Sequence, residues 1–184
     1  PQEKPQEKPQ EKPQEQKRIS FSELKVWKEC PYKHKLVYID KEPYFSGNEY
    51  TAFGTTIHTL CESLVTNGSA PPFEEEFEKS LKELESYDDQ LVDDMKNSAH
   101  EILKEILPTL DSYFGKYEVV SVEEELLEEI MDFESYGKRF KGYIDLVLKT
   151  PDGKYHIIDW KTCSWGWNMK KRTDPMVIYQ LMYY

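Results

Sequence analysis

Cysteine and long apolar runs are scarce in this chain of 184 residues, and basic residues are outnumbered by acidic ones. Three cysteines, odd in number and far apart, argue against a disulfide-stapled scaffold and indicate the reducing cytoplasm. No apolar run approaches the roughly 18 residues that cross a bilayer, so we expect no membrane-spanning segment, and no signal peptide precedes the body. The 24 Lys and Arg against 35 Asp and Glu give a net charge of −11, which argues against wholesale wrapping of nucleic acid.

The rest of the composition is that of a globular protein. With 38% hydrophobic and 14% aromatic residues, the chain can form one domain with a sizeable core. Residues 1–18 repeat Pro-Gln-Glu-Lys without an apolar side chain, so we predict a disordered tail that acts as a spacer, followed by one domain over residues 19–184. Apolar periodicity still runs through residues 177–184, so we expect a fragment of a longer protein, truncated at its C-terminal end.

The first half of the domain predicts helices. A Ser-x-x-Glu capping box at residues 20–23 starts the first one. Thr55 or Thr56 is predicted to cap a short helix that holds an apolar face. An apolar stripe with spacings of three and four over residues 73–110 predicts a long helical stretch, divided near residues 87–89.

The second half predicts strands, because the apolar period changes to two from Tyr117. Strands are predicted over residues 118–127, 132–136, 139–149 and 155–161, with turns at residues 136–138 and 151–153. Helices followed by a meander of strands and a final helix predict an α/β (α+β) domain with an N-terminal helical portion.

Charge is unevenly distributed between these halves. Residues 74–129 carry 19 acidic and 5 basic side chains, a net of −14, which we interpret as a solvated helical face. Residues 138–172 carry 9 basic and 3 acidic side chains, a net of +6. A phosphate-rich partner is therefore expected to bind the strand half.

Two aspartates and a lysine converge in the predicted hairpin. Asp159 and Lys161 alternate onto one strand face, and Asp145 of the preceding strand can pair across to it. A structural salt bridge with Lys161 would satisfy one carboxylate and leave the other repelled, and a carboxylate in a sheet interior needs a partner. We therefore favour the alternative, in which two carboxylates and a backbone carbonyl bind Mg²⁺ or Mn²⁺.

Five motifs occur in an order that identifies a family. They are Ser20-Phe21-Ser22-Glu23-Leu24 with Cys30-Pro31-Tyr32, Gly54 with His58, Asp145, Asp159-Trp160-Lys161, and Gln180 with Tyr184. Each is weak alone, but in this order they resemble the PD-(D/E)XK nuclease superfamily and specifically its RecB-like branch, which includes AddB and CRISPR-associated exonucleases. The resemblance extends from about residue 19 to 184 and implies a restriction-endonuclease-like core, with a central mixed β-sheet flanked by helices.

The resemblance also implies roles for the matched residues. It assigns the metal ion to Asp145, Asp159, the Trp160 backbone carbonyl and His58, which together with Lys161 form the catalytic set. Lys161 would orient the attacking water or stabilise charge that develops on phosphate. Gln180 and Tyr184 would contact the backbone of the scissile DNA strand and brace the site from the last helix.

Two further acids lie close to these motifs in sequence. Glu62 follows His58 by one helical turn and could share its face, although an exposed carboxylate is the favoured interpretation. Glu125 precedes the Asp145 hairpin and could support the site, but its acidic surroundings favour solvated surface. The other histidines, His34, His100 and His156, have no motif around them.

A [4Fe–4S] cluster is not expected in this chain, although many RecB-like nucleases bind one through one early and three late cysteines. Cys30 matches the early position, while Cys61 and Cys163 do not have the spacing of cluster ligands.

Aromatic and basic residues are interleaved after the Asp159 motif. Trp167 is followed by Lys170, Lys171 and Arg172. Packing of the tryptophan at the core or its rim is one interpretation. The other is that a base stacks here while the basic residues follow the phosphates of a single strand.

We therefore predict a metal-dependent deoxyribonuclease, more specifically a RecB-like exonuclease acting on single-stranded DNA or DNA ends in repair, recombination or phage and CRISPR DNA processing. A structure-specific endonuclease with the same site is the first alternative. A non-catalytic nucleic-acid-binding module of a helicase–nuclease or recombination complex is the second. A third is an acidic helical surface that docks a basic protein.

Overall fold

The computed structural model describes residues 17–42, 47–129, 138–163 and 166–183. Residues 1–16 of the predicted tail, the predicted strand over 132–136 and Tyr184 lie outside the described residues. The predicted turn at residues 136–138 lies there too, apart from its last residue.

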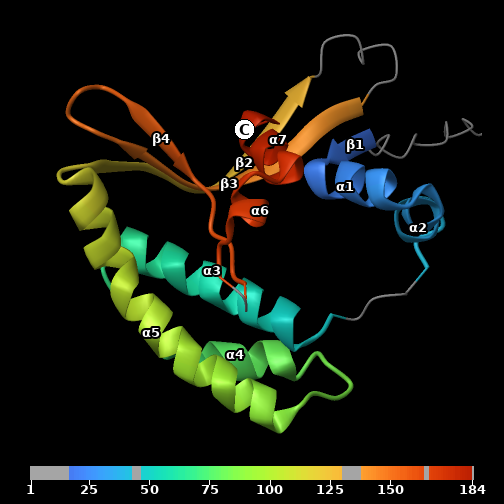
Figure 1. Cartoon of the computed structure of the whole chain (residues 1–184), viewed down its shortest axis with the longest axis horizontal. Helices are drawn as coiled ribbons and strands as arrows, with labels where there is room; N and C mark the ends of the chain where they lie inside the picture. Colours follow the sequence, from blue (N-terminus) through green and yellow to red (C-terminus); the bar gives the residue numbers. More distant parts are fainter. Residues whose placement is uncertain (1–16, 43–46, 130–137, 164–165, 184) are drawn as a thin grey trace, which may run out of the picture.

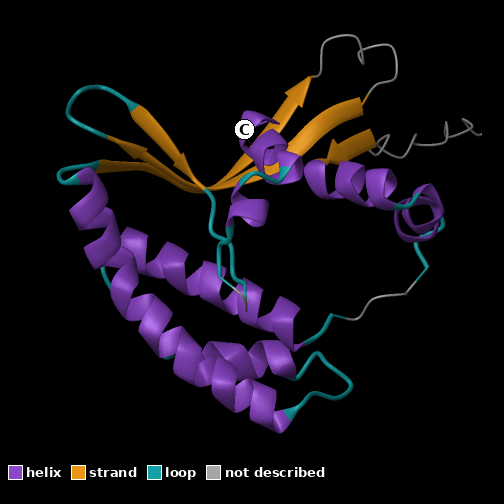
Figure 2. Cartoon of the chain, viewed as in Figure 1, coloured by secondary structure: helices purple, strands orange, loops and turns teal. Residues whose placement is uncertain are grey.

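Within the described residues, four strands form one mixed sheet (Figures 1 and 2). They are β1 (Lys17–Ser20), β2 (Glu118–Glu129), β3 (Lys138–Lys149) and β4 (Tyr155–Ile158). β2 runs antiparallel to β3 along its length. β1 pairs in parallel with the first residues of β3, and β4 pairs antiparallel with the last. Because β2 occupies one edge of β3, β1 and β4 share the other edge.

The helices flank this sheet. They are α1 (Phe21–Glu29), α2 (Pro31–His34), the π-helix η1 (Lys35–Ile39), α3 (Glu49–Asn67), α4 (Phe73–Leu81), α5 (Asp89–Phe114), α6 (Met169–Arg172) and α7 (Pro175–Tyr183). In Figure 1, α3, α4 and α5 group together, while α1 and α7 lie at the end of the sheet that holds β1. The predicted α/β class, with a central mixed sheet flanked by helices, is confirmed.

Polar side chains cap the start of several helices, among them α1, α3 and α5. The Ser20 hydroxyl accepts a hydrogen bond from the Glu23 amide at 3.1 Å, which confirms the predicted cap. The long apolar stripe divides as predicted, and Asp88 caps α5 by accepting from the Leu91 amide. The predicted start of the next helix at Thr55 or Thr56 is wrong, because α3 begins after Asn48, whose side chain caps it.

Two boundaries also differ from those predicted. Lys17 and Arg18, assigned to the tail, belong to β1 and pair with the start of β3. The last predicted strand, over residues 155–161, ends at Ile158. The turn between β3 and β4 is confirmed, with Gly153 at φ +82, a conformation that favours glycine.

Trp160 joins two hydrophobic clusters. The first, between α3, α4 and α5, is built around Leu60, Phe77 and Ala99, which are fully buried. The second lies where Leu146 and Leu148 of β3 meet the end of α5. Trp160 packs against both clusters and so fixes the segment between β4 and α6, which contains Asp159 and Lys161.

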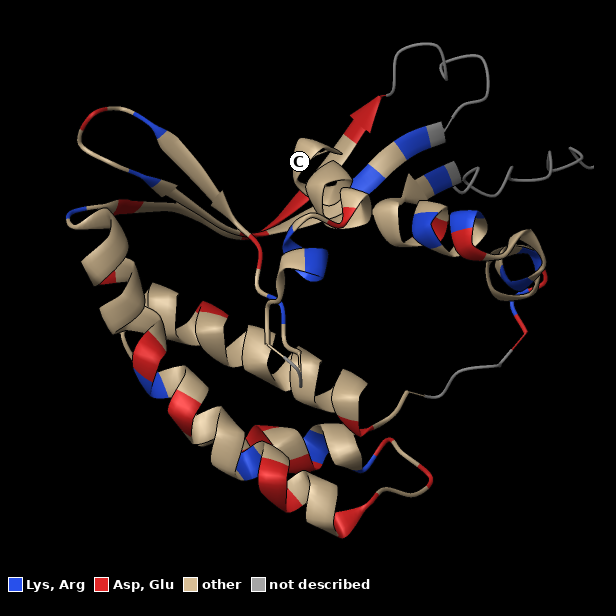
Figure 3. Cartoon of the chain, viewed as in Figure 1, with Lys and Arg blue, Asp and Glu red and all other residues tan. Residues whose placement is uncertain are grey.

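The charge separation predicted from the sequence follows the fold. Acidic residues are spread along α4 and α5, and basic residues lie on the first half of β3 and on α6 (Figure 3). Among the described residues, no helix combines the length and apolar character needed to cross a membrane.

Candidate active site

Asp145 lies at the centre of the candidate site, on β3. Only 8% of the residue is exposed, and its Oδ2 accepts a hydrogen bond of 2.6 Å from the Trp160 amide. The chain after β4 therefore turns back onto the carboxylate. A buried carboxylate between Ile144 and Leu146 requires such a partner.

His58 approaches the same carboxylate from α3. Its Nδ1 lies 3.7 Å from Asp145 Oδ2, and its side chain is 28% exposed. Four residues earlier on α3, Gly54 lies against the segment that follows Lys161, because a Cβ built there would be 3.3 Å from Thr162 Oγ1. The missing side chain lets α3 approach the segment that carries Asp159 and Lys161.

Glu123 is the third member of this cluster. Ligand atoms of His58, Glu123 and Asp145 all lie within 4.8 Å of one another. Along β2 and β3, Val122 pairs with Leu146 and Glu124 with Ile144, which places Glu123 opposite Asp145. Its φ of +49 is unusual for a residue with a side chain, and such strain concentrates at functional sites.

Sequence reasoning missed Glu123. Strand alternation places Glu123 and Glu125 on one face of β2. Only the register between β2 and β3 determines which of the two lies opposite Asp145. A register shift between Val119 and Ser121 makes that register harder to predict. Glu125, the acid singled out from the sequence, forms an ion pair with Lys141 at 3.0 Å instead.

Asp159 and Lys161 contact each other directly. The Lys161 ammonium lies 2.6 Å from Asp159 Oδ2 and 2.7 Å from Oδ1. Gln180 of α7 donates to the same carboxylate, with Nε2 3.0 Å from Oδ1. The structure thus brings together the hairpin motif and the α7 motif, although Asp159 is not among the three residues of the compact cluster.

The electrostatics of the cluster are unfavourable without a cation. Burial raises the pKa of Asp145, as does the nearby Asp159 carboxylate, while the Trp160 amide, His58 and Lys161 oppose the rise. Burial also raises the pKa of Glu123, helped by the charges of Asp145 and Glu62. Two acids that resist ionisation therefore face one imidazole.

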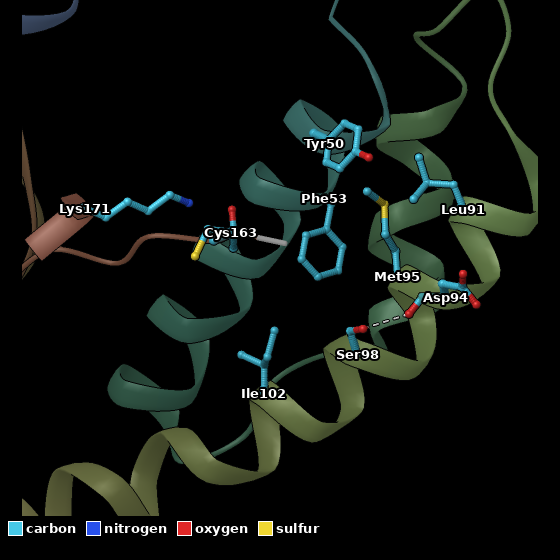
Figure 4. Close-up of a pocket in the computed structure, with 10 residues that line it drawn as sticks. Tyr50, Phe53, Leu91, Asp94, Met95, Ser98, Ile102, Cys163 and Lys171 are labelled. Carbon is cyan, nitrogen blue, oxygen red and sulfur yellow. Dashed lines mark hydrogen bonds between the residues drawn. The ribbon is translucent and has the colours of Figure 1, made fainter. Parts of the chain in front are cut away.

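Of the other predicted residues, Glu62 lies beside the cluster, and the aromatic and basic residues lie around α6. Glu62 lines the hollow that also holds His58 and Glu123. Trp167 is 37% exposed, its carbonyl accepts from the Arg172 Nε at 3.1 Å, and Lys170 is exposed. Lys171 lines a separate cavity together with Cys163 (Figure 4).

The remaining histidines and cysteines have local roles. His34 contacts Glu23, His100 contacts Glu74 and His156 contacts Thr150, at 2.9, 2.6 and 3.0 Å. The Cys30 thiol caps α2 by accepting from the Lys33 amide. Burial raises the pKa of Cys61 to about 12, so this thiol stays protonated and unreactive at neutral pH.

A family model of the PD-(D/E)XK nuclease superfamily matches residues 18–184, which is nearly the whole chain. The chain belongs to this superfamily. No curated protein matched its sequence. Membership implies nuclease activity, and PD-(D/E)XK nucleases typically use divalent metals.

The cluster fits the metal that a PD-(D/E)XK nuclease uses. Two carboxylates and an imidazole supply oxygen and nitrogen ligands suited to a divalent cation. A cation would also neutralise the repulsion that raises the pKa of Asp145 and Glu123. His58, Glu123 and Asp145 are therefore the candidate ligands of this nuclease.

Proposed function

We propose that this PD-(D/E)XK nuclease is a RecB-like enzyme that hydrolyses phosphodiester bonds of DNA with Mg²⁺ or Mn²⁺. We infer an exonuclease that acts on single strands or DNA ends, in repair, recombination or phage and CRISPR DNA processing. A helicase is the proposed partner, and co-purification tests it. The observation that carries the proposal is the convergence of His58, Glu123 and Asp145 beside the Asp159–Lys161 pair.

In this proposal, His58, Glu123 and Asp145 hold the ion. The motif order adds Asp159 and the Trp160 carbonyl as further ligands. Bound there, a divalent ion lowers the pKa of a coordinated water and polarises a phosphoryl oxygen. The Trp160 amide donates to the Asp145 carboxylate and fixes it. Lys161, which follows Trp160 in the motif, is therefore held beside the ion site.

Lys161 is the positively charged residue of the proposed site and does not bind the metal ion. Asp159 holds its ammonium at 2.6 Å and Gln180 holds Asp159 in turn, so the segment after β4 and α7 together set its position. We propose that Lys161 orients the attacking water or stabilises the charge that develops on phosphate. We also propose that a second group of residues contacts the DNA strand: Gln180, Tyr184, Trp167, Lys170, Lys171 and Arg172.

The test is degradation of end-labelled linear DNA, single- and double-stranded, with Mn²⁺, Mg²⁺ or EDTA. Cleavage that requires a metal and falls by about 100- to 1000-fold in Lys161→Ala supports the nuclease. Lys116→Ala, an exposed lysine between α5 and β2, is the matched control. Binding without cleavage by the folded chain would instead support a nucleic-acid-binding module.

A supercoiled circle distinguishes the two nuclease alternatives. A strict exonuclease leaves it intact, because the circle offers no end. Cleavage of the circle that also disappears in Lys161→Ala would replace the exonuclease by a structure-specific endonuclease with the same site.

A further inference from the structure

A cavity of about 540 Å³ opens between α3, α5 and the segment that follows Lys161. Its size lies within the range of small-molecule sites, roughly 300–1,000 Å³. Phe53 and Met95, both buried, form part of its wall, whereas Tyr50 is 51% exposed. Figure 4 shows Lys171 on one side of this cavity and Asp94 with Ser98 on the other.

The cavity is adjacent to the metal cluster. Thr162, which lines it, directly follows Lys161 in the chain. Tyr50 lines both this cavity and the hollow that holds His58 and Glu123. At 1.5 Å per residue, Tyr50 lies about 12 Å from His58 along α3. A DNA strand bound at the metal cluster could therefore reach the cavity within a few nucleotides, which are spaced about 3.4 Å apart when stacked.

The chemistry of the cavity suits a nucleotide in one orientation. Lys171 attracts a phosphate, while the carboxylate of Asp94 repels one and can accept from a base amino group. The ring of Tyr50 offers a surface on which any base can stack. A nucleotide with its phosphate near Lys171 and its base directed toward α5 therefore matches the charge on both sides of the cavity.

We propose that this cavity binds an unpaired nucleobase of the DNA strand held at the metal cluster. The inference rests on the proposed function and specifies its substrate as single-stranded at that position, because a base inside a duplex is paired and stacked. Tyr50 stacks on the base, Lys171 contacts its phosphate and Asp94 accepts a hydrogen bond from its edge.

The test measures binding in EDTA, so that cleavage does not interfere. The probes are a fluorescently labelled single-stranded oligonucleotide and the same strand with abasic sites. Tyr50→Ala removes the stacking ring, and Ser98→Trp fills the cavity from an exposed position of α5. Tyr113→Ala, an 81% exposed tyrosine near the end of α5, is the matched control. Circular dichroism verifies that each variant is folded.

We expect the unmodified protein to bind the abasic strand about tenfold more weakly than the intact one, the effect of losing one stacked base. Tyr50→Ala and Ser98→Trp should bind the intact strand about tenfold more weakly and no longer distinguish the two probes. Tyr113→Ala should behave as the unmodified protein.

Equal binding of both probes by the unmodified protein, or wild-type affinity and discrimination in both cavity variants, overturns the cavity proposal. Failure to bind single strands at all overturns it too. Base-dependent binding without metal-dependent cleavage would leave the cavity standing and refute the nuclease. Cleavage lost in Lys161→Ala but without discrimination between the probes would refute the cavity alone.

Discussion

Two carboxylates of β2, two residues apart, lie in opposite surroundings. Glu125 forms an ion pair with Lys141 across the sheet at 3.0 Å. Glu123 instead meets Asp145, a second acid, and ligand atoms of both residues lie within 4.8 Å of one another and of His58. One position is neutralised within the chain, and the other is not.

This difference indicates which carboxylate serves function. The Glu125–Lys141 pair is partly exposed, and such pairs contribute little to stability. The Glu123–Asp145 approach costs free energy, because desolvation and the charge of Asp145 raise the pKa of Glu123, an exposed residue that also has a positive φ. A fold retains such a cost where a ligand relieves it.

The largest expected effect comes from Asp145→Asn. Removing this charge should lower metal-dependent cleavage by about 1000-fold or more, the upper range for loss of one electrostatic stabiliser. It should also abolish the rise in melting temperature that Mn²⁺ gives the unmodified protein. Cleavage rates and thermal unfolding with and without Mn²⁺ measure both effects.

Glu125→Gln is the matched control on the neighbouring strand. It removes an equivalent charge whose partner is Lys141, so cleavage should change by less than about twofold and the Mn²⁺ shift should persist. A loss as large as that of Asp145→Asn would show that the two carboxylates are not functionally distinct.

A smaller effect is expected of Glu123→Gln. With His58 and Asp145 still present, the affinity for Mn²⁺ should fall by about 10- to 100-fold rather than vanish. Saturating Mn²⁺ should then restore part of the cleavage rate. Calorimetric titration measures the affinity, and an unchanged affinity would remove Glu123 from the ligand set.

The stability of the metal-free protein should depend on pH through the same carboxylates. Because the pKa of Asp145 is raised in the folded state, the folded chain retains its proton above the ordinary Asp pKa of about 3.9. The free energy of unfolding therefore decreases as pH rises from about 4 through the raised pKa. Asp145→Asn should lessen this decrease and be more stable than the unmodified protein at pH 8.

Asp152 provides a control of opposite sign. Its carboxylate pairs with Lys154 and Thr150 in the turn after β3, which lowers its pKa. The contribution of Asp152 to the free energy of unfolding is therefore lost only as pH falls below about 4. Urea unfolding in EDTA between pH 4 and 8 should give Asp152→Asn the same slope as the unmodified protein, and a slope unchanged in Asp145→Asn would contradict the pH prediction.

What could be predicted from the sequence depends on the range of the interactions involved. The cap at Ser20 involves residues close in the chain, and the structure has it. Asp159 and Lys161 are also close in the chain, but the ion pair between them is the interpretation that was not favoured. The position of Gln180 beside Asp159 came from a motif rather than from periodicity. Family resemblance thus supplied a long-range contact that local patterns could not.

The errors have physical causes. Asn48 caps α3 earlier than Thr55 or Thr56, since the apolar face of that helix already includes Ala52 and Phe53. Glu123 escaped notice because its place opposite Asp145 depends on the register between β2 and β3. Long-range register, rather than residue type, separated the candidate metal ligand from its neighbours.

The smallest expected effect concerns Gly54, where α3 meets the segment after Lys161. A Cβ there would lie 3.3 Å from Thr162 Oγ1, so Gly54→Ala should displace that segment by a few tenths of an ångström and lower cleavage several-fold with little loss of stability. Thr162→Ala removes the opposing hydroxyl, and combining the two substitutions should restore most of the rate. Gly68→Ala offers no such contact and serves as a control for cleavage, although its φ of +71 lowers stability. If the double variant stays as slow as Gly54→Ala, the close approach of α3 does not position Lys161.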